Sequence, residues 1–369
     1  MTKRRSNPLL HLLSWLYGVG VDIRNTLFDQ GILKQKKYPI PLICVGNITV
    51  GGTGKTPHIE LLLNLLTPEH RVAVISRGYK RQSHGLQIAT ASSTVQQVGD
   101  EPRQIALKYP HVQVIVDGNR RRAMKFLLAQ PAERRPEVVL LDDGFQHRYV
   151  QPSFSILLVD ASRELHEDAL LPVGSLREPA SARYRADCII LTKCPVDLQP
   201  IDLRIMRRNL ALYTHQDIFF SRIAYQEARP LRNLKQPVDE ILPFGAPVIA
   251  VAGIASTGLF FEDLKRYYKV MATVAFHDHH NFRSSDLKHI RDVWEREQAF
   301  AGIAQSVSIV CTEKDAVRLM DLEPKLDDEL AERIFYLPIT TEILFKPEDF
   351  RKMILQAAKA LPPSLQRMS

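Results

Sequence analysis

The sequence predicts an α/β protein: a doubly wound, mostly parallel sheet followed by a second, smaller α/β domain. From residue 40 onward, short runs of β-branched and other apolar residues alternate with amphipathic stretches. Continuous apolar strands between helices are typical of parallel sheets that are covered on both faces. The 369 residues also suffice for two domains of roughly 150 residues or more, each with a core of its own.

The elements of the first sheet follow in order along the chain. Runs rich in Val, Ile and Leu predict strands at 41–45, 72–76, 112–116, 138–141, 154–159, 188–191 and 218–223. Between them, apolar residues at helical spacing predict helices at 57–66 and 120–128. This alternation is the pattern of a doubly wound sheet.

A stretch rich in proline and charge, 229–247, precedes a second run of the same alternation. Strands are expected there at 248–251, 270–276, 306–310 and 334–337, and helices at 260–265, 285–300 and 347–360. We therefore expect an N-terminal helix within 1–35, a nucleotide-binding domain over 36–228 and a smaller domain over 229–369.

The composition is that of an ordinary globular protein, with 45% hydrophobic and 24% charged residues. Disordered, collagen-like and fibrous chains are thereby excluded. The four cysteines include no Cys-x-x-Cys pair, which argues against a disulfide framework or a zinc site and fits a reducing compartment.

The net charge of +8 is concentrated near the start of the chain. Residues 1–40 hold seven basic and two acidic residues, a net charge of +5. Between the basic clusters lies an uncharged, largely apolar run from Ser6 to Val21, which is short of the ~20 residues of a spanning helix. It is either an interfacial helix with Trp15 and Tyr17 at headgroup level or a helix that packs on the core.

The strongest local signal is a glycine-rich loop between a strand and a helix, Cys44-Val-Gly-Asn-Ile-Thr-Val-Gly-Gly-Thr-Gly-Lys-Thr-Pro57. Backbone N–H groups at such a helix start form a cradle for phosphate. Lys55 is expected to reach the β- and γ-phosphates, and the Thr56 hydroxyl to ligate Mg²⁺. Thr49 stands where the usual pattern has glycine. The alternative is a glycine-rich turn that merely caps a helix.

Acidic residues mark two further segments. An apolar strand ends in Asp142 and Asp143, the expected source of a Mg²⁺-ordering carboxylate, with a capping turn as the alternative. Asp100 and Glu101 lie before a proline and are expected in a rigid turn. Asp100 is a candidate to accept the proton of an attacking hydroxyl.

Two basic clusters allow more than one interpretation. Arg120, Arg121 and Arg122 stand at a strand–helix junction, where they suit either a phosphate or a solvated helix face. The segment from His277 to His280 resembles a metal cluster, but its side chains would alternate if extended. We favour one histidine tuning a catalytic carboxylate over a zinc site.

Taken together and in order, these motifs resemble the tetraacyldisaccharide 4′-kinase family, the lipid A kinases of Gram-negative bacteria. The resemblance spans nearly the whole chain, and Thr49 belongs to the family's own loop pattern. The matching stretches are Val45–Pro57, Ser76–Tyr79, Val98–Pro102, Leu141–His147, Pro172–Pro179, Thr192–Lys193, Ala252–Ala255, Asp278–His279 and Thr312–Asp315.

The resemblance implies transfer of the γ-phosphate of ATP to the 4′-hydroxyl of an acylated glucosamine disaccharide 1-phosphate. It also implies a peripheral protein on the cytoplasmic face of the inner membrane, and we expect a monomer. The implied nucleotide-binding residues are Thr49, Val50, Gly51, Gly52, Thr53, Gly54, Lys55 and Thr56.

For the chemistry, the resemblance makes Asp100 the general base, His279 its orienting partner and Lys55 a catalytic cation. Thr56, Asp142 and Asp143 would bind Mg²⁺, and the resemblance leaves open which of the two aspartates contacts the ion. Contacts to phosphates or sugar would come from Tyr79, Arg120, Arg122 and Glu178.

The main rival is a membrane-cycling P-loop ATPase of the partitioning type. Such proteins carry a signature lysine before two glycines, where this chain has Val50. A regulatory GTPase is a weaker alternative, because Pro195 stands where such a protein has the aspartate that recognises guanine. A nucleic-acid-binding module is disfavoured, since the net charge outside residues 1–40 is only +3.

Overall fold

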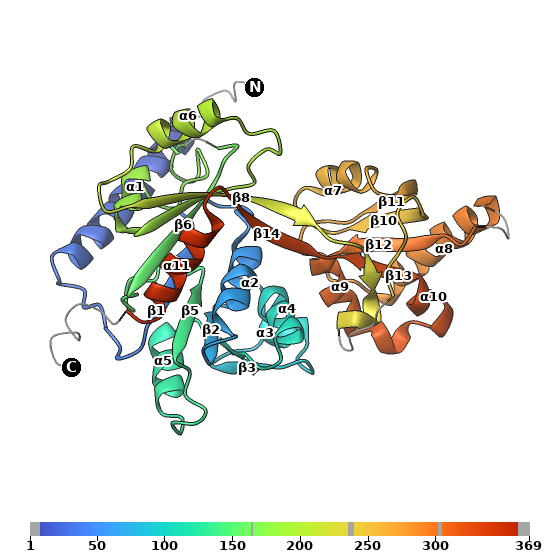
Figure 1. The fold of residues 1–369 in the computed structure, drawn as a ribbon, viewed down its shortest axis with the longest axis horizontal. Coiled ribbons are helices and arrows are strands. Elements are labelled where there is room, and N and C mark those ends of the chain that lie inside the picture. Colours follow the sequence, from blue (N-terminus) through green and yellow to red (C-terminus); the bar gives the residue numbers. More distant parts are fainter. Residues whose placement is uncertain (1–7, 164, 235–239, 302–304, 361–369) are drawn as a thin grey trace. The chain divides into compact units, whose positions relative to one another are not determined.

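The computed structural model describes residues 8–163, 165–234, 240–301 and 305–360. Contacts within the chain group it into two compact units (Figure 1). Unit 1 comprises Met1–Arg77, Val112–Ile223 and Thr341–Ser369, and unit 2 comprises Gly78–His111 and Ala224–Thr340. This grouping assigns Gly78–His111 to the unit that holds most of the predicted smaller domain, and the domain boundaries at 35 and 228 stay a prediction.

A large, mostly parallel sheet forms the centre of unit 1, as the sequence predicts. The strands of this sheet that belong to unit 1 follow the order β14-β8-β7-β6-β1-β5-β2-β4, and all neighbours from β8 to β4 are parallel. The strands are β1 (Leu42–Gly46), β2 (Val72–Ser76), β4 (Gln113–Val116), β5 (Val138–Asp142), β6 (Phe154–Asp160), β7 (Cys188–Thr192), β8 (Asp217–Tyr225) and β14 (Ile339–Leu344). β1, β2, β5 and β7 are buried along their whole length, which explains their uninterrupted apolar sequence.

The helices of unit 1 are α1 (Pro8–Asp29), α2 (Lys55–Leu66), α5 (Arg120–Leu128), α6 (Pro200–Leu210), α11 (Pro347–Ala357) and the 3₁₀ turn η1 (Ala180–Arg185). α2 and α11 contact each other (Figure 1). α2 buries Ile59, Leu62, Leu63 and Leu66, the apolar positions that predicted it.

The topology of unit 1 places a switch point at β1. The chain runs from β1 to β2 and β4 on one side, returns through β5, and continues to β6 and β7 on the other side. Parallel sheets bind ligands at the carboxyl ends of strands where the order reverses. The glycine-rich loop follows β1, and Asp142 ends β5 directly beside it, because Val45 is in register with Asp142.

Unit 2 has a five-stranded sheet in the order β11-β10-β12-β13-β9. Its strands are β9 (Arg229–Pro230), β10 (Pro247–Ala252), β11 (Lys269–Ala275), β12 (Ser308–Thr312) and β13 (Ile334–Leu337). Only the β13–β9 pair is antiparallel. Alternate residues of β10 enter two apolar clusters, Ile249 and Val251 one and Val248 and Ala250 the other, so both faces of this sheet are covered.

The remaining elements of unit 2 are β3 (Gln87–Ala89), α3 (Val95–Val98), α4 (Asp100–Lys108), η2 (Leu231–Leu234), α7 (Thr257–Leu264), α8 (Ser284–Ala301), α9 (Glu313–Leu319), η3 (Met320–Lys325) and α10 (Asp328–Arg333). The rigid turn predicted around Asp100 is wrong. α3 ends at Val98 and α4 begins at Asp100, with Gly99 at a φ of 90° between them. Pro102 lies in the first turn of α4, where its missing N–H costs nothing.

The N-terminal helix α1 has its apolar side chains largely in solvent. It buries only Gly18 and Phe28 among its residues, although Ser14 Oγ donates to the Leu170 carbonyl at 2.8 Å. One side of α1 therefore contacts the rest of unit 1, and both alternatives for this helix stay open. Across the described residues, no helix combines the length and apolarity needed to cross a membrane.

Candidate active site

The glycine-rich loop joins β1 to α2 and has the backbone of a phosphate cradle. Gly51 and Gly54 have φ values of 105° and 82°, in the region that favours glycine. Gly54 is the N-cap of α2, and it offers no side-chain capping bond. The first N–H groups of the helix, together with the helix dipole, are therefore oriented to bind an anion.

The loop is held from outside by the segment that contains the predicted residue Glu178. The Val50 N–H donates to the Ser175 carbonyl at 2.7 Å, and the Arg177 N–H to the Ile48 carbonyl at 2.7 Å. Thr49 forms a β-bridge with Leu176. These backbone bonds fix the first half of the loop. Thr49, which stands where the usual pattern has glycine, is buried within this half of the loop.

His58 holds the second half of the loop through both of its ring nitrogens. Its Nδ1 lies 2.7 Å from the Gly54 carbonyl and its Nε2 lies 2.9 Å from Ser221 Oγ on β8. Burial lowers the pKa of His58 to about 4, so the ring is neutral, with Nδ1–H donating and Nε2 accepting. His58 was not singled out from the sequence. Its position one helical turn after the last glycine of the loop is the signal that could have indicated it.

The two aspartates at the end of β5 have different surroundings. Asp142 is buried and accepts a hydrogen bond from Ser76 Oγ at 2.8 Å. Asp143 has a φ of 49° and lies 3.6 Å from Lys55 Nζ and 3.1 Å from Arg177 Nη1. Burial acts to raise the pKa of Asp143, but Lys55 and Arg177 outweigh it, so the pKa lies below its usual value.

These groups form a donor set that suits Mg²⁺. Thr56 is buried at the start of α2, and its hydroxyl belongs to the same unit as the two carboxylates. Hydroxyl and carboxylate oxygens are the ligands that Mg²⁺ takes beside nucleotide phosphates. Asn47 Nδ2 also donates to Thr53 Oγ1 at 3.0 Å, which fixes the loop beside them.

The predicted arginines already have partners within the chain. Arg120 is buried and donates to the Asp117 carbonyl at 3.1 Å. Arg122 forms a two-point contact with the Asp117 carboxylate at 2.6 and 2.8 Å. Glu178 is likewise buried, paired with Arg185 at 2.8 Å and accepting from Asn25 of α1 at 3.1 Å.

Unit 2 brings Asp100 and His279 together, although 179 residues separate them. Asp100 begins α4, and its Oδ2 lies 3.0 Å from His279 Nδ1. His279 lies in a turn with a φ of 58°, so the extended conformation considered for this segment is wrong. Tyr79 is exposed and meets the His279 ring edge-on at 5.6 Å, whereas His280 instead pairs with Asp286 at 2.9 Å.

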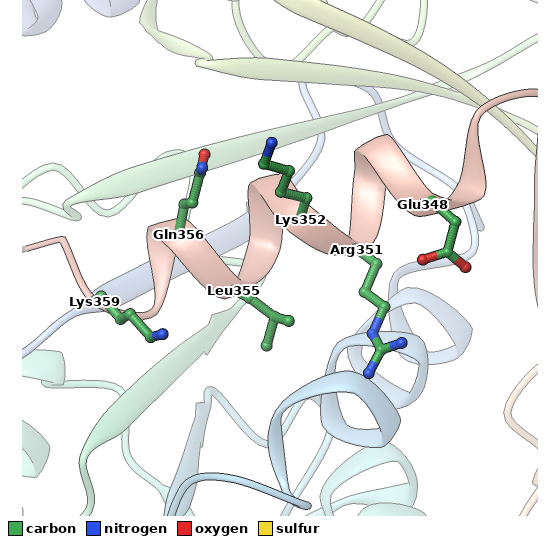
Figure 2. Close-up of a pocket in the computed structure, with 6 residues that line it drawn as sticks. All are labelled: Glu348, Arg351, Lys352, Leu355, Gln356 and Lys359. Carbon is green, nitrogen blue, oxygen red and sulfur yellow. The ribbon is translucent and has the colours of Figure 1, made fainter.

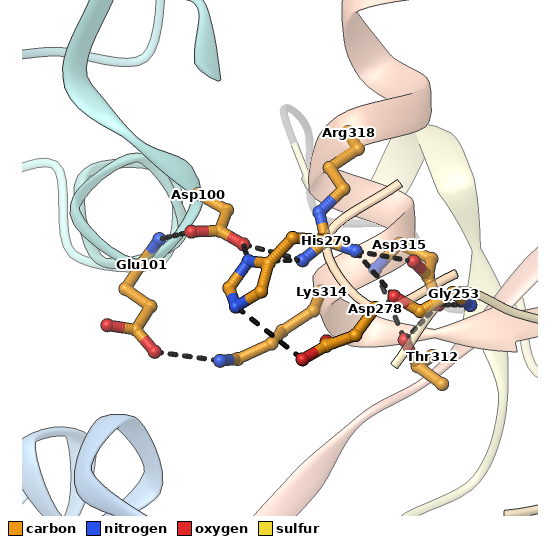
Figure 3. A network of polar contacts seen from close by, with 9 residues as sticks. All are labelled: Asp100, Glu101, Gly253, Asp278, His279, Thr312, Lys314, Asp315 and Arg318. Carbon is orange, nitrogen blue, oxygen red and sulfur yellow. Dashed lines mark hydrogen bonds and ion pairs between the residues drawn. The ribbon is translucent and has the colours of Figure 1, made fainter. Parts of the chain in front are cut away.

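Two cations from α9 complete this cluster (Figure 3). Arg318 Nη2 donates to Asp100 Oδ2 at 2.6 Å, and Lys314 Nζ to Glu101 Oε1 at 2.7 Å. Burial acts to raise the pKa of Asp100. The hydrogen bond from His279 and the charges of Lys314 and Arg318 outweigh burial and hold this pKa well below its usual range. Sequence reasoning quoted Thr312–Asp315 only as a matching stretch and missed Arg318.

The described surface also has a shallow hollow of about 350 Å³ against α11. Figure 2 shows the six residues that line it, Glu348, Arg351, Lys352, Leu355, Gln356 and Lys359. None of the predicted site residues is among them. In each unit the chemistry of the side chains, and not the size of a hollow, identifies the candidate groups: the glycine-rich loop in unit 1 and the Asp100 cluster in unit 2.

A phosphate loop after β1 and acidic residues after the adjacent strand define a P-loop protein with a nucleotide-phosphate site. Comparisons with known proteins narrow this class. The profile of the family described as tetraacyldisaccharide-1-P 4′-kinase matches residues 6–359. The chain therefore belongs to the tetraacyldisaccharide 4′-kinase family, as the sequence resemblance predicted.

Similar proteins cover almost the whole chain. A tetraacyldisaccharide 4′-kinase of Porphyromonas gingivalis is 47% identical over 352 residues, 94% of this chain and 96% of the relative. One of Parabacteroides distasonis is 43% identical over 353 residues, 95% of this chain and 94% of the relative. The crystal structure of LpxK from Aquifex aeolicus in complex with ATP is 30% identical, with a TM-score of 0.73, covering 95% of this chain and 98% of that one.

Proposed function

We propose that this protein transfers the γ-phosphate of ATP to the 4′-hydroxyl of a tetraacyl glucosamine disaccharide 1-phosphate, a lipid A precursor. The observation that carries the proposal is the family membership over residues 6–359 together with the phosphate loop built around Lys55. In the reaction, the 4′-oxygen bonds to the γ-phosphorus while the bond from that phosphorus to the β,γ-bridging oxygen breaks. ADP leaves, and the hydroxyl proton passes to a protein base.

Unit 1 supplies the groups for the donor. The loop from Thr49 to Thr56 binds the phosphates through those backbone N–H groups that have no partner in the chain, which excludes that of Val50, and Lys55 stabilises the negative charge on the transferred phosphoryl group. Thr56 and the aspartates Asp142 and Asp143 would hold Mg²⁺, which when bound with ATP neutralises phosphate charge. The contact between Lys55 and Asp143 at 3.6 Å supports this assignment, because a cation for the phosphates and a carboxylate for Mg²⁺ are expected to be neighbours.

Unit 2 supplies the groups for the acceptor. We assign the general base to Asp100, with His279 as its orienting partner, on the strength of their 3.0 Å contact. Base catalysis of this kind contributes about 10²–10⁴-fold. Of the proposed substrate contacts, Tyr79 is exposed beside His279. Arg120, Arg122 and Glu178 also remain proposed contacts, although Arg122 and Glu178 must give up their ion pairs to serve.

An apolar stripe on α1 supports peripheral binding to a membrane. Helical spacing places five exposed residues on one face, Leu9, Leu12, Leu16, Val19 and Ile23. The opposite face is bound to the rest of unit 1, where Ser14 Oγ donates to the Leu170 carbonyl at 2.8 Å and Asn25 to Glu178. The basic residues Lys3, Arg4 and Arg5 lie outside the described residues.

We further propose that this membrane is the inner membrane of a Gram-negative bacterium, at its cytoplasmic face, and that the protein acts as a monomer. The two substrates support the cytoplasmic face, because ATP is made in the cytoplasm and an acylated sugar cannot leave the bilayer. An apolar stripe in the interface would keep the protein beside its lipid substrate.

The test is transfer of labelled γ-phosphate by the purified full-length protein, with Mg²⁺ and the acylated disaccharide in mixed micelles. We expect a labelled lipid product that forms only with the acceptor present, and loss of product in Lys55→Ala. ATP hydrolysis that is independent of the acceptor, with no labelled lipid, would favour the membrane-cycling ATPase instead.

A further inference from the structure

We propose that Arg318 is a positioning residue of the phosphoryl transfer, which fixes the Asp100 carboxylate and the His279 ring in the arrangement that takes up the acceptor's proton. The inference rests on the proposed function and adds to it a residue outside the sequence prediction. Figure 3 shows the guanidinium between Asp100 and Asp315, with His279 beside it.

The guanidinium of Arg318 is held on three sides. Its side chain is only 4% exposed. Nη2 donates to Asp100 Oδ2 at 2.6 Å, and Nη1 donates to Asp315 Oδ1 and to the Gly253 carbonyl, both at 2.9 Å. The three acceptors come from the start of α4, from α9 and from the loop after β10, so the planar fork links three separate segments.

Asp315, which holds Arg318, is itself fixed. Its Oδ2 accepts from the Gly253 N–H at 2.8 Å and from Thr312 Oγ1 at 2.6 Å. It has no exposed surface, and burial outweighs Arg318 to raise its pKa. Arg318 is therefore a rigid support for Asp100 and not a mobile surface cation, since moving it would remove one hydrogen bond from each of three buried acceptors and leave the guanidinium itself buried without its partners.

Arg318 also bears on which nitrogen of the His279 ring carries the proton, but it does so through Asp100. Its Nη2 lies 3.3 Å from His279 Nδ1, and a guanidinium can only donate, so the partner that sets the tautomer is the Asp100 carboxylate, which Arg318 holds at 2.6 Å. An ionised Asp100 can only accept, so the His279 Nδ1 that faces it at 3.0 Å carries the proton. The Nε2 lone pair is then on the opposite side of the ring, where Asp278 Oδ2 lies 4.0 Å from it.

The charge of Arg318 acts on Asp100 together with its other neighbours. Lys314 adds a second positive charge, while Glu101 pairs with Lys314 at 2.7 Å. Without Arg318, His279 and Lys314 would remain to oppose the effect of burial, and the pKa of Asp100 would rise. A protonated Asp100 can neither take the acceptor's proton nor hold the Nδ1–H form of His279, so both members of the pair depend on Arg318.

The chain offers a matched control in Arg103. This arginine is also buried, and it also links α4 to the region of α9, because its Nη1 donates to the Val317 carbonyl at 2.8 Å and pairs with Asp321. Replacing Arg103 removes a comparable buried guanidinium and its bonds to Val317 and Asp321, while the bonds of Arg318 to Asp100 and Asp315 keep both their partners.

The experiment compares Arg318→Gln, Arg318→Lys and Arg103→Gln in the full-length protein. We expect Arg318→Gln to lower kcat by about 10–100-fold with the KM values for ATP and acceptor little changed, and to move the acidic limb of the kcat–pH profile to higher pH. Arg318→Lys keeps the charge and should recover part of the rate and the original limb. Arg103→Gln should lower the unfolding temperature and leave kcat unchanged.

A second measurement needs neither donor nor acceptor. Nitrogen-15 NMR of His279 should show protonated Nδ1 in the wild type and loss of that preference in Arg318→Gln, or in Arg318→Lys to a lesser extent if the glutamine variant does not fold. An unchanged tautomer, or an unchanged kcat and pH profile in folded Arg318→Gln, would overturn the inference. A wild-type protein that phosphorylates no acceptor while the tautomer still depends on Arg318 would instead overturn the proposed function.

Discussion

Replacing Leu12 and Leu16 by serine should release the protein from anionic membranes. These side chains lie one turn apart on the exposed stripe of α1 and are 53% and 51% exposed. Full burial of a leucine contributes about 1.5–3 kcal/mol, and roughly half of each side chain remains to be buried. The two changes should together cost about 1.5–3 kcal/mol of binding free energy, which is roughly a 10- to 150-fold weaker partition.

The chain carries its own fluorescent reporter for this assay. Of its two tryptophans, Trp15 is 64% exposed on α1, whereas Trp294 is buried and donates to the Val307 carbonyl at 2.8 Å. Titration with phosphatidylethanolamine–phosphatidylglycerol vesicles should shift the emission of Trp15 to the blue and leave Trp294 as a constant background.

The matched control replaces two exposed apolar residues of unit 2, Leu259 and Phe300, by serine. They are 70% and 81% exposed and lie on α7 and α8, away from the stripe in the sequence. The control should bind vesicles as the wild type does. The reasoning fails if the Leu12/Leu16 variant binds within about threefold of the wild type, or if the control loses as much affinity.

Three further predictions concern the phosphate loop. Lys55→Ala should lower transfer by about 10²–10³-fold with an unchanged circular dichroism spectrum; a fully active variant would remove Lys55 from the mechanism. Gly46→Ala should cost about 1–3 kcal/mol in urea unfolding, because a Cβ there would lie 2.6 Å from Phe145 Cβ; unchanged stability would contradict this close contact. Burial lowers the pKa of His58 from 6.5 to about 4, so the unfolded chain takes up a proton at this residue at a higher pH than the folded chain does. The contribution of neutral His58 to the free energy of unfolding is therefore complete above pH 6.5 and is lost as the pH falls toward 4. The loss should be about 3 kcal/mol, and His58→Gln should flatten this part of the stability–pH curve.

Buried strands could be predicted because both of their faces are apolar. The strand Val72–Ser76, the helix Arg120–Leu128 and the strand Ile334–Leu337 have the predicted bounds. Their sequence period leaves no alternative, since either an unbroken apolar run or a 3.6-residue spacing is present. The fold class followed from this alternation alone.

Short helices that begin at polar residues were harder to predict. α4 begins at Asp100, and the Asp-Glu-Pro sequence that suggested a turn is also a helix start, with acidic residues and proline in its first turn. Only the three apolar or small residues further along, Ile105, Ala106 and Leu107, which are buried, decide between the two.

The candidate site could be predicted only as far as its motifs are contiguous. The phosphate loop is one segment, so its geometry follows from its own sequence. The contact between Asp100 and His279 depends on tertiary structure, and the family resemblance, not the spacing, indicated both residues. Arg318 left no local signal, because an arginine on a short helix has the pattern of a solvated residue until the fold buries it.

Phosphate position in the product tests the central claim most directly. A phosphate at the anomeric 1-position is released by mild acid, whereas a phosphate ester at the 4′-position survives it. After transfer from γ-labelled ATP, we predict that the label stays on the acylated disaccharide through this treatment, and that the unlabelled 1-phosphate is released. Label that is released with the 1-phosphate, or label found only as free phosphate, would contradict the assignment of this protein as a 4′-kinase.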